Sequence, residues 1–524
     1  MKRRDFCKGL AVTLAAGALA PAAALPQAGA ATALVGRAVP DDYYTLWYRS
    51  DRCGADLRHD YYYSDSLFDH PATEYDNHLA LATLGMAAAA DCPWESDQRY
   101  WMEGEVGRAD HIRDAFAKLG FTEVQLFNYT HSLNDTPDTV GCAVARKTLV
   151  RGGRQVTIIG AFLRGSGYGA EWSGNLHAGP GSAHVGFVTA ARQLVEKTRA
   201  YVQASAKRQP LGTLKLWMGG YSRGGGVANL VAARLPAVLP QLEKKNTFVY
   251  TFAAPASLTA ADCPDLQQDY DNNHAADGRL KKDWGTSNIF NIVSSGDVIP
   301  RILPAEWGFY RNGNDRFLPS TVIPEELQAL NDRSAGMEGT PIDFGRLAVA
   351  EETDAVLRSM MDLFCDRQTY YKGYEDAMRC MLQCATTRTE EEVTRGIVRD
   401  DAAVVAQLRS MELMQRFPQE KVERCVQAAS ALSRPVLEKL GSAVPLQAQQ
   451  IVIPMLAVGL CFELQPETVQ LVADFVLSTI TVKGQLSGIL KTVLCHFQEN
   501  YITVLEAYDP ADHGMTPYTR REEL

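Results

Sequence analysis

The sequence predicts an α/β fold in which a mostly parallel sheet carries a large helical insertion, and three observations support this prediction. Strand-like segments alternate with helices of crossover length from about residue 105 to residue 255. A glycine-rich stretch, WMGGYSRGGG at 217–226, lies between one such strand and the helix after it. Beyond Phe317 apolar residues recur every three or four positions, which is typical of helices.

The composition is that of a globular protein with a sizeable core. Of the 524 residues, 46% are hydrophobic and 22% are charged, and the formal net charge is -10. Proteins hold phosphate backbones with clustered lysine and arginine, so this acidic balance argues against a nucleic-acid partner. The length suits one large domain with an insertion, or two to three domains.

Residues 1–30 are expected to form a twin-arginine-type signal peptide. Arg3 and Arg4 precede an apolar stretch from Gly9 to about Leu25, and small residues follow at 28–30. A membrane anchor is the alternative, but the stretch is rich in alanine, contains prolines and is short for a span of ~20 strongly apolar residues. The signal peptide would direct export of the protein, and its cleavage would leave the mature protein in the periplasm or the medium. It would also take the formal charge from -10 to -13, because four basic residues and one acidic residue leave.

The cysteines indicate disulfides rather than a metal site. Eleven are present, and loss of Cys7 with the signal peptide would leave an even number in a compartment where disulfides persist. We therefore expect some pairing. The closest spacing, from Cys380 to Cys384, corresponds to one helical turn and not to a zinc ribbon, so we expect neither a metal nor another cofactor.

The order of the predicted elements builds the sheet. Residues 40–95 are rich in tyrosine and aspartate, end in a helical pattern at 74–91, and are expected to form a packing arm. Strands separated by helices of crossover length pair in parallel. The segments after the arm are a helix at 109–121, strands at 123–130, 139–150 and 154–165 with a turn at Gly152 and Gly153, a helix at 184–205, a strand at 214–220, a helix at 225–235 and a strand at 247–255.

The motif Gly220-Tyr221-Ser222-Arg223-Gly224 lies between a predicted strand and a predicted helix and matches the G-x-S-x-G pattern of a nucleophile elbow. A serine on such a strained turn brings the backbone close to its neighbours, so a Cβ at Gly220 or Gly224 should collide. The turn also puts Ser222 beside a helix N-terminus, where N–H groups stabilise an oxyanion. A simple glycine-rich turn is the alternative, but the strand and the helix fall where the motif requires them.

Together with four other stretches, this motif resembles the class 3 lipase family, and in particular its bacterial lipase-like members, over roughly residues 60–320 plus a short C-terminal piece. The resemblance implies an α/β-hydrolase-type fold. Tyr221 departs from the family, which most often has histidine there. The five stretches, in chain order, are AFLRGSGYGAEWSGNL, HVGF, GYSRGGGVANLVAARL, VYTFAAP and NIFNIVSSGDVIPRILP.

The resemblance implies Ser222 as the nucleophile and Asp297 as the acid of a catalytic triad. Asp297 also follows a predicted strand at 287–295, so it should lie at the carboxyl end of that strand, where the catalytic groups of α/β sheets collect. An Asx turn before Pro300 is the alternative interpretation. The candidate oxyanion-hole donors are the N–H groups of Arg223, which follows the nucleophile, and of Ser166, which occupies the place of the family's oxyanion residue. A plain strand-to-loop turn would also explain Ser166.

The candidate base is one of two histidines. In α/β-hydrolases the base follows the acid, and only His496 and His513 lie beyond Asp297. His496 follows an apolar stretch and precedes Tyr501 by five residues, which resembles the family's C-terminal His-x-x-x-x-Tyr. His513 lies in a polar tail, and such termini are often loosely ordered. A base needs a packed setting to meet its partners, so we predict His496 and keep His513 as the alternative.

These assignments predict four parts of the chain. They are the signal peptide (1–30), an α/β-hydrolase domain with an N-terminal arm (31–319), a helical insertion (320–490) that caps the mouth of that domain, and a C-terminal segment (491–524) that completes it. The Met- and Leu-rich faces of the insertion would hold an acyl chain or form an ordinary bundle core.

The predicted function is that of an exported serine hydrolase, a lipase or carboxylesterase, that cleaves acyl esters through a Ser-Asp-His triad and a covalent acyl-enzyme. Its partners would be an acyl ester or lipid substrate and, transiently, a lipid surface. Two alternatives remain open. One is a noncatalytic surface-binding protein with the α/β-hydrolase fold, and the other is a phospholipase or acyltransferase with the same triad.

Overall fold

The structure is a computed structural model that describes most of the chain between residues 38 and 507. The predicted signal peptide and His513 lie outside the described residues. Among the described helices, none combines the length and the apolar character that a bilayer span requires. The gaps in the description are at 51, 54, 92–103, 106–108, 132–136, 168, 182, 260–285, 319–323, 340–341, 388–391, 393–394, 442–445 and 471–487.

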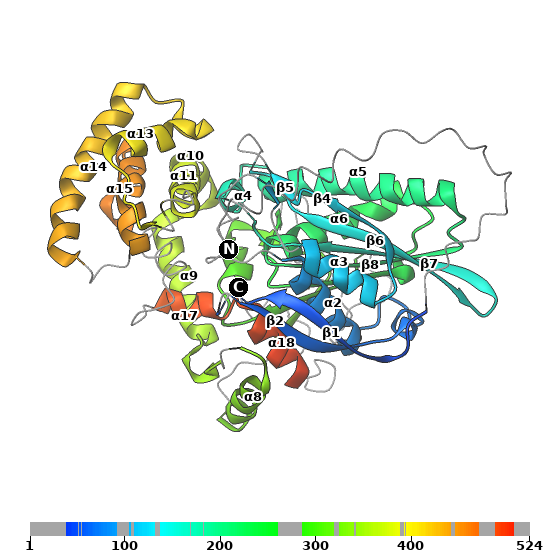
Figure 1. Ribbon diagram of the computed structural model, residues 1–524. Coiled ribbons are helices and arrows are strands. Elements are labelled where there is room, and N and C mark those ends of the chain that lie inside the picture. The colour runs from blue at the N-terminus through cyan, green and yellow to red at the C-terminus, as the bar shows by residue number, and fades with distance from the viewer. Residues whose placement is uncertain are drawn as a thin grey trace, which may run out of the picture. The chain divides into compact units, whose positions relative to one another are not determined.

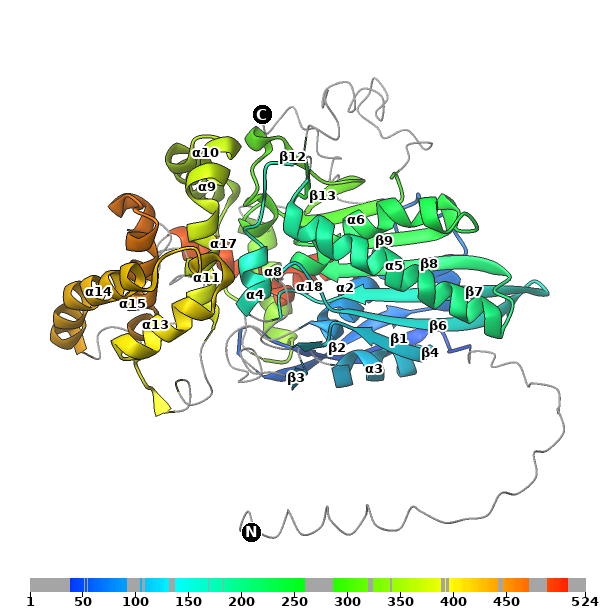
Figure 2. The same ribbon diagram turned by 90° about the horizontal axis from the view of Figure 1, so that it is seen from above.

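The main sheet has seven strands within the described residues, and it is mostly parallel, as predicted. The pairs from β7 to β13 are parallel, whereas β6 pairs with β7 and with β4 in the antiparallel sense (Figure 2). In spatial order the strands are β13 (Asn314–Leu318), β11 (Ile289–Ser294), β9 (Thr247–Phe252), β8 (Thr213–Tyr221), β7 (Arg154–Leu163), β6 (Cys142–Arg151) and β4 (Thr122–Phe127).

Helices cover both faces of this sheet, which gives an α/β-hydrolase-type architecture (Figure 1). Along β8 the side chains alternate, so Trp217 packs in the core with α2 and α3, and Met218 packs in the core with α5 and α6. All six residues of β9 are buried, as expected of a central parallel strand. The four helices are α2 (Asn77–Ala90), α3 (Ala109–Lys118), α5 (Val185–Arg208) and α6 (Arg223–Val238).

The N-terminal arm contains more structure than its sequence predicted. Its helix is α2, whose N-terminal amide at Leu79 donates to the side chain of Asp76. The preceding strands β1 (Asp42–Arg49) and β2 (Asp56–Tyr63) form an antiparallel ribbon that the sequence reading did not anticipate. Burial alternates along both strands, so aromatic residues cover one face of the ribbon. This alternation is typical of strands, but the many aspartates in the same stretch are unfavourable in strands, and the prediction missed it.

The segment predicted as the insertion is helical with short turns where the structure describes it. Residues 467–480 share the apolar periodicity that predicts helices beyond Phe317, but they lie largely outside the described residues. The described helices of the segment are α8 (Pro324–Gly336), α9 (Ala350–Phe364), α10 (Arg367–Gly373), α11 (Glu375–Thr386), α13 (Asp401–Ser410), α14 (Gln419–Leu440) and α15 (Leu446–Cys461).

The first part of this segment belongs to the core of the sheet domain. Three of its residues, which follow β13 in the sequence, pack in the same hydrophobic cluster as Trp217; they are Leu330, Ile342 and Phe344. A second core begins near Phe364 and runs through α11, α13, α14 and α15, and it also includes Leu303 and Phe309 of the sheet domain. After it come the short helices α17 (Gly488–Leu494) and α18 (Gln498–Ala507).

The expected cysteine pairing is not seen among the described residues. Eight cysteines are described, and all of them are free. Pairing that involves the remaining cysteines stays a prediction. The part of the chain that the structure describes also contains no group of three or more histidine, cysteine, aspartate or glutamate side chains that is arranged to hold a metal ion.

Candidate active site

Ser222 occupies a strained turn between β8 and α6. Its φ of 54° and ψ of -126° lie outside the regions that a serine ordinarily adopts. Hydrogen bonds on both sides hold this backbone: Ser222 N–H donates to Phe252 O at 2.9 Å, and Gly226 N–H donates to Ser222 O at 3.0 Å. The side chain is therefore presented at the carboxyl end of β8, at the start of a helix.

The two glycines of the motif are required for steric reasons, as the sequence predicted. A Cβ at Gly220 would lie 2.5 Å from the carbonyl carbon of Gly224, and a Cβ at Gly224 would lie 2.4 Å from Leu163 O. Real Cβ atoms do not approach backbone so closely. The second contact also shows that the elbow lies directly against the end of β7, from which the segment of Ser166 continues.

Three of the predicted site residues form a hydrogen-bonded chain. His496 Nδ1 lies 2.8 Å from Asp297 Oδ2, and His496 Nε2 lies 2.9 Å from Ser222 Oγ. Asp297 follows β11 and is fully buried, so its carboxylate assigns the imidazole proton to Nδ1. Nε2 then carries a free lone pair and can accept the proton of the Ser222 hydroxyl.

Two tyrosines hold the acid and the base in place. Tyr501 donates its hydroxyl to Asp297 Oδ2 at 2.8 Å. Burial, followed by the charge of Asp297, raises the pKa of Tyr501 well above its usual value, so this hydroxyl stays protonated. The Tyr221 hydroxyl donates to the carbonyl of His496. No role for Tyr221 was predicted from the sequence, because its partner lies 275 positions away and no local motif predicts such a contact.

The two candidate oxyanion-hole residues are joined by one side chain, that of Asn175. Its Nδ2 donates to Ser166 Oγ at 2.8 Å, and its Oδ1 accepts from Arg223 Nη1 at 2.8 Å. The Arg223 side chain is itself buried. Asn175 therefore connects the loop after β7 with the first residue of α6. Roles for Ser166 and Arg223 were predicted from the sequence. Asn175 was given no role, although it lies within a stretch that carries the family resemblance.

A buried ion pair shapes the loop that contains Ser166. Arg164 Nη1 lies 2.6 Å from Glu171 Oε2, and both side chains are fully inaccessible to solvent. The same carboxylate oxygen accepts from Gly167 N–H at 2.7 Å. Removing one partner of a buried pair strands the other charge, at a cost of about 3–5 kcal/mol. The conformation of this loop is thus strongly specified.

The segment around Asn175 is supported from both sides. His184, the N-cap of α5, donates from Nε2 to Asn175 O at 2.9 Å, and burial lowers the pKa of His184 to about 3. From the insertion, Tyr370 donates its hydroxyl to Leu176 O at 3.0 Å, and Glu375 accepts from Gly179 N–H at 2.8 Å. Helices α10 and α11 therefore touch the chain directly after Asn175.

The comparison with protein families finds a match for the central part of the chain. Residues 165–307 match the model of the class 3 lipase family. The match covers less than half of the chain. It contains Ser166, Ser222 and Asp297 but ends before His496. The curated proteins contain no match to this chain.

Several solved lipase structures are similar to the chain. One is a triacylglycerol lipase whose catalytic centre is described as a serine protease triad, with 20% identity, 39% of this chain and 69% of that chain covered, and a TM-score of 0.29. The Rhizomucor miehei triacylglyceride lipase is 19% identical, with 46% of this chain and 79% of that chain covered and a TM-score of 0.31. Lipase II from Rhizopus niveus is 18% identical, with 37% of this chain and 65% of that chain covered and a TM-score of 0.25.

Proposed function

We propose that the protein is an exported serine hydrolase that cleaves acyl esters, a lipase or carboxylesterase, through a covalent acyl-enzyme. One observation carries this proposal: the hydrogen-bonded chain from Asp297 through His496 to Ser222, with distances of 2.8 and 2.9 Å. The match to the class 3 lipase family supports the acyl ester as the substrate class.

In the proposed mechanism, Ser222 Oγ attacks the ester carbonyl while His496 Nε2 takes its proton. Asp297 orients the imidazole and stabilises the imidazolium that forms. The negative charge on the carbonyl oxygen is met by the N–H groups of Arg223 and Ser166. His496 then gives its proton to the departing alcohol, and the acyl group stays on Ser222 until water, activated by the same histidine, releases it.

The helical insertion is proposed as a cap that contacts the lipid. Its contacts with the chain after Asn175 support a position next to the site. Apolar residues of its core, such as Met381 and Leu382, pack in one cluster with Leu303 and Phe309 of the sheet domain. In this proposal, opening of the cap would let an acyl chain enter during transient contact with a lipid surface.

Labelling with a fluorophosphonate probe tests the proposed chemistry. Wild-type protein should be labelled and Ser222→Ala should not, whereas a noncatalytic binding protein would show no labelling in either. Hydrolysis of a short-chain nitrophenyl ester then tests the base. His496→Ala should lose turnover, and His513→Ala should keep it. The opposite pattern would move the assignment to His513.

Substrate profiling separates the remaining alternatives. Triacylglycerols and simple esters should be hydrolysed faster than phospholipids, and added alcohol acceptors should not replace water as the main acceptor of the acyl group. The reverse preferences would indicate the phospholipase or the acyltransferase. Export is tested by replacing Arg3 and Arg4 with lysine, since the twin-arginine pathway reads that pair and the variant should stay in the cytoplasm.

A further inference from the structure

We infer that Asp91 is a positioning residue that ties the segment of the proposed oxyanion donor Ser166 to the segment of the proposed base His496. This inference rests on the proposed function. It concerns a residue that neither the sequence motifs nor the triad geometry includes.

The carboxylate of Asp91 accepts one hydrogen bond from each of the two segments. Oδ1 accepts from Gly165 N–H at 2.6 Å, and Oδ2 accepts from the side-chain amide of Gln498. Gly165 immediately precedes Ser166, and Gln498 follows His496 by two residues. A single side chain therefore links the two segments.

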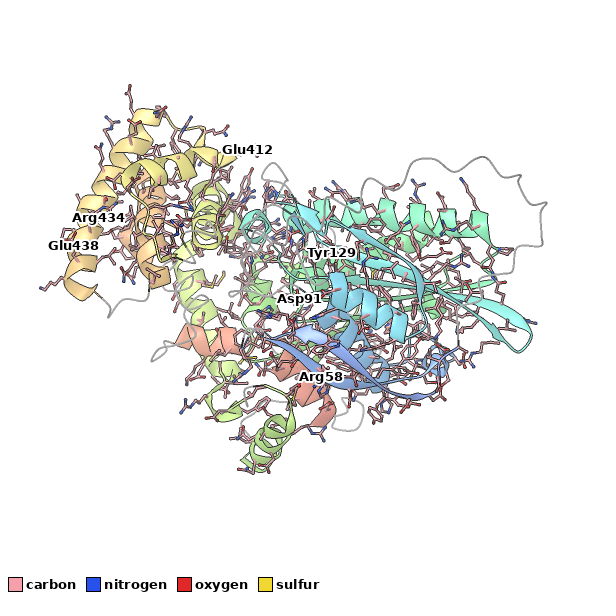
Figure 3. The ribbon with its side chains drawn as sticks, in the orientation of Figure 1. Arg58, Asp91, Tyr129, Glu412, Arg434 and Glu438 are labelled. Atoms are coloured by element: carbon pink, nitrogen blue, oxygen red, sulfur yellow. The ribbon has the colours of Figure 1, made fainter. Side chains whose placement is uncertain are left out.

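Asp91 is well placed to hold both segments because α2, which it follows, is anchored in the core. Trp217 Nε1–H donates to Thr83 Oγ1 of α2 at 2.7 Å, and Tyr129 donates its hydroxyl to Ala90 O at 3.0 Å. Figure 3 labels both Asp91 and Tyr129 near the end of this helix. Asp91 itself is only 7% exposed.

The close approach of Gly165 to Asp91 is a second, steric indication that this contact is specific. A Cβ at position 165 would lie 2.7 Å from Asp91 Oδ1 and would displace the carboxylate. Hydrogen bonds to a carboxylate are shorter and stronger than those between neutral groups. Gln498 is 2% exposed, so its amide would lose a buried acceptor if the carboxylate were removed.

The expected consequence is a loss of alignment rather than a loss of a reacting group. An oxyanion-hole donor works only when it lies about 2.7–3.1 Å from the developing charge, and removing such a donor costs about 10²–10³ in rate. A displaced donor and a displaced base should cost less than that. We expect Asp91→Ala to lower kcat by about 10- to 100-fold and to change KM by less than about threefold.

The experiment compares four variants: Asp91→Ala, Gln498→Ala, the double variant, and Asn288→Ala as a control. Asn288→Ala also removes a buried side-chain amide, but this amide donates to Thr247 O at 2.6 Å, at the amino end of β9 and not in either of the two segments. For each, kcat on a short-chain nitrophenyl ester is divided by the number of sites that a fluorophosphonate probe titrates, so misfolded protein is not counted. Gln498→Ala should lower kcat by about 3- to 10-fold, and Asn288→Ala by less than about twofold.

The double variant distinguishes a shared link from two separate contributions. If Gln498 acts through Asp91, the double variant should lose no more than Asp91→Ala alone. Multiplied losses, or an unchanged kcat in Asp91→Ala, would overturn the inference. If Asp91→Ala does not fold, Gln498→Ala decides: an unchanged kcat per titrated site overturns the inference and a reduced one supports it. A wild-type protein that neither labels nor hydrolyses would instead overturn the proposed function.

Discussion

The sheet domain and the helical insertion contribute to the candidate site in different ways. In the sheet domain, side chains bond to one another, from Asp297 to His496 and from His496 to Ser222. From the insertion, Tyr370 and Glu375 bond to the backbone of the loop that follows Asn175. The sheet domain therefore contains the proposed reacting groups. The insertion supports the loop after Asn175, whose side chain bonds to the two candidate oxyanion-hole residues.

This difference has a measurable meaning. Substitutions of the same chemical kind should lower kcat far more in the sheet domain than in the insertion, because a bond to a reacting group acts on the transition state directly. A bond to a supporting loop acts only through the position of Asn175 and its two partners. The following variants test that ranking, starting with the largest expected effect.

Asp297→Asn should have the largest effect of the series. The amide can no longer hold the imidazole of His496 with its proton on Nδ1, so Nε2 loses its role as acceptor, and kcat should fall by about 10³- to 10⁴-fold. The melting temperature should change little, since the substitution keeps the shape of the side chain. Steady-state kinetics per titrated site and thermal unfolding measure the two quantities.

Asp315→Asn is the matched control for that variant. Asp315 lies on β13 at one edge of the same sheet and pairs with Arg311 at 2.6 Å. It should lose stability and keep its kcat. An equal loss of kcat in both variants would show that Asp297 acts through the fold of the sheet edge and not on the histidine.

The triad was predictable because its members carry local signals. Ser222 lies in a five-residue motif whose glycines are required, because a Cβ at either position would lie 2.4 to 2.5 Å from backbone atoms. Asp297 follows a strongly apolar strand. Chain order left His496 and His513 as candidates for the base. His496 was preferred because its stretch resembles the family's C-terminal His-x-x-x-x-Tyr and because a base needs a packed setting. The roles assigned to these residues stay predictions, but the sequence sufficed to choose residues that the fold brings together.

The supporting contacts were not predictable, because they join segments that are distant in the sequence. Asp91 meets Gln498 across 407 positions, and Tyr370 meets Leu176 across 194. Both residues lie in helical sequence patterns, but such a pattern does not report which distant segment a side chain meets. The insertion was likewise foreseen only as helices, since apolar periodicity reports that a face is buried and not what it is buried against.

Tyr501→Phe should have the next largest effect and would extend the comparison to a residue that does not react. The variant removes a donor to Asp297 Oδ2. A hydrogen bond to a charged group contributes about 1.5–3 kcal/mol, part of which is felt only in folding, so we expect kcat to fall by about tenfold. Tyr250→Phe is the control, because its buried hydroxyl accepts from Asp76 N–H and touches no site residue. Similar kcat values for the two variants would contradict the role given to Tyr501.

Tyr370→Phe measures the contribution of the insertion. Its ring stays packed against Phe364, but the hydrogen bond to Leu176 O is lost. A neutral hydrogen bond contributes about 1 kcal/mol, so kcat should fall by no more than about fivefold. The neighbouring Tyr371, which is 39% exposed, provides Tyr371→Phe as the control. A loss as large as that of Asp297→Asn would break the distinction between the two regions.

The smallest expected effect is the change of the free energy of unfolding with pH. His184 of the sheet domain and Glu375 of the insertion should change it in opposite directions. Burial lowers the pKa of His184 from 6.5 to about 3, so below pH 6.5 the unfolded chain takes up a proton that the folded chain does not. Stability from the sheet side is therefore lost as the pH falls from 6.5 toward 3. Burial raises the pKa of Glu375, so from the insertion side stability is lost as the pH rises through its folded pKa.

Urea unfolding at pH 7.5 and pH 5.5 tests the sheet side of this pair. Wild-type protein should lose about 1 kcal/mol more than His184→Asn between these values, since asparagine can still cap α5 but does not titrate. Glu375→Gln should gain stability relative to wild type at pH 7.5, because the amide keeps an acceptor for Gly179 N–H without a buried charge. The stability differences between wild type and each of the two variants should change with pH in opposite directions. A change in the same direction for both would contradict the opposite pH responses assigned to His184 and Glu375.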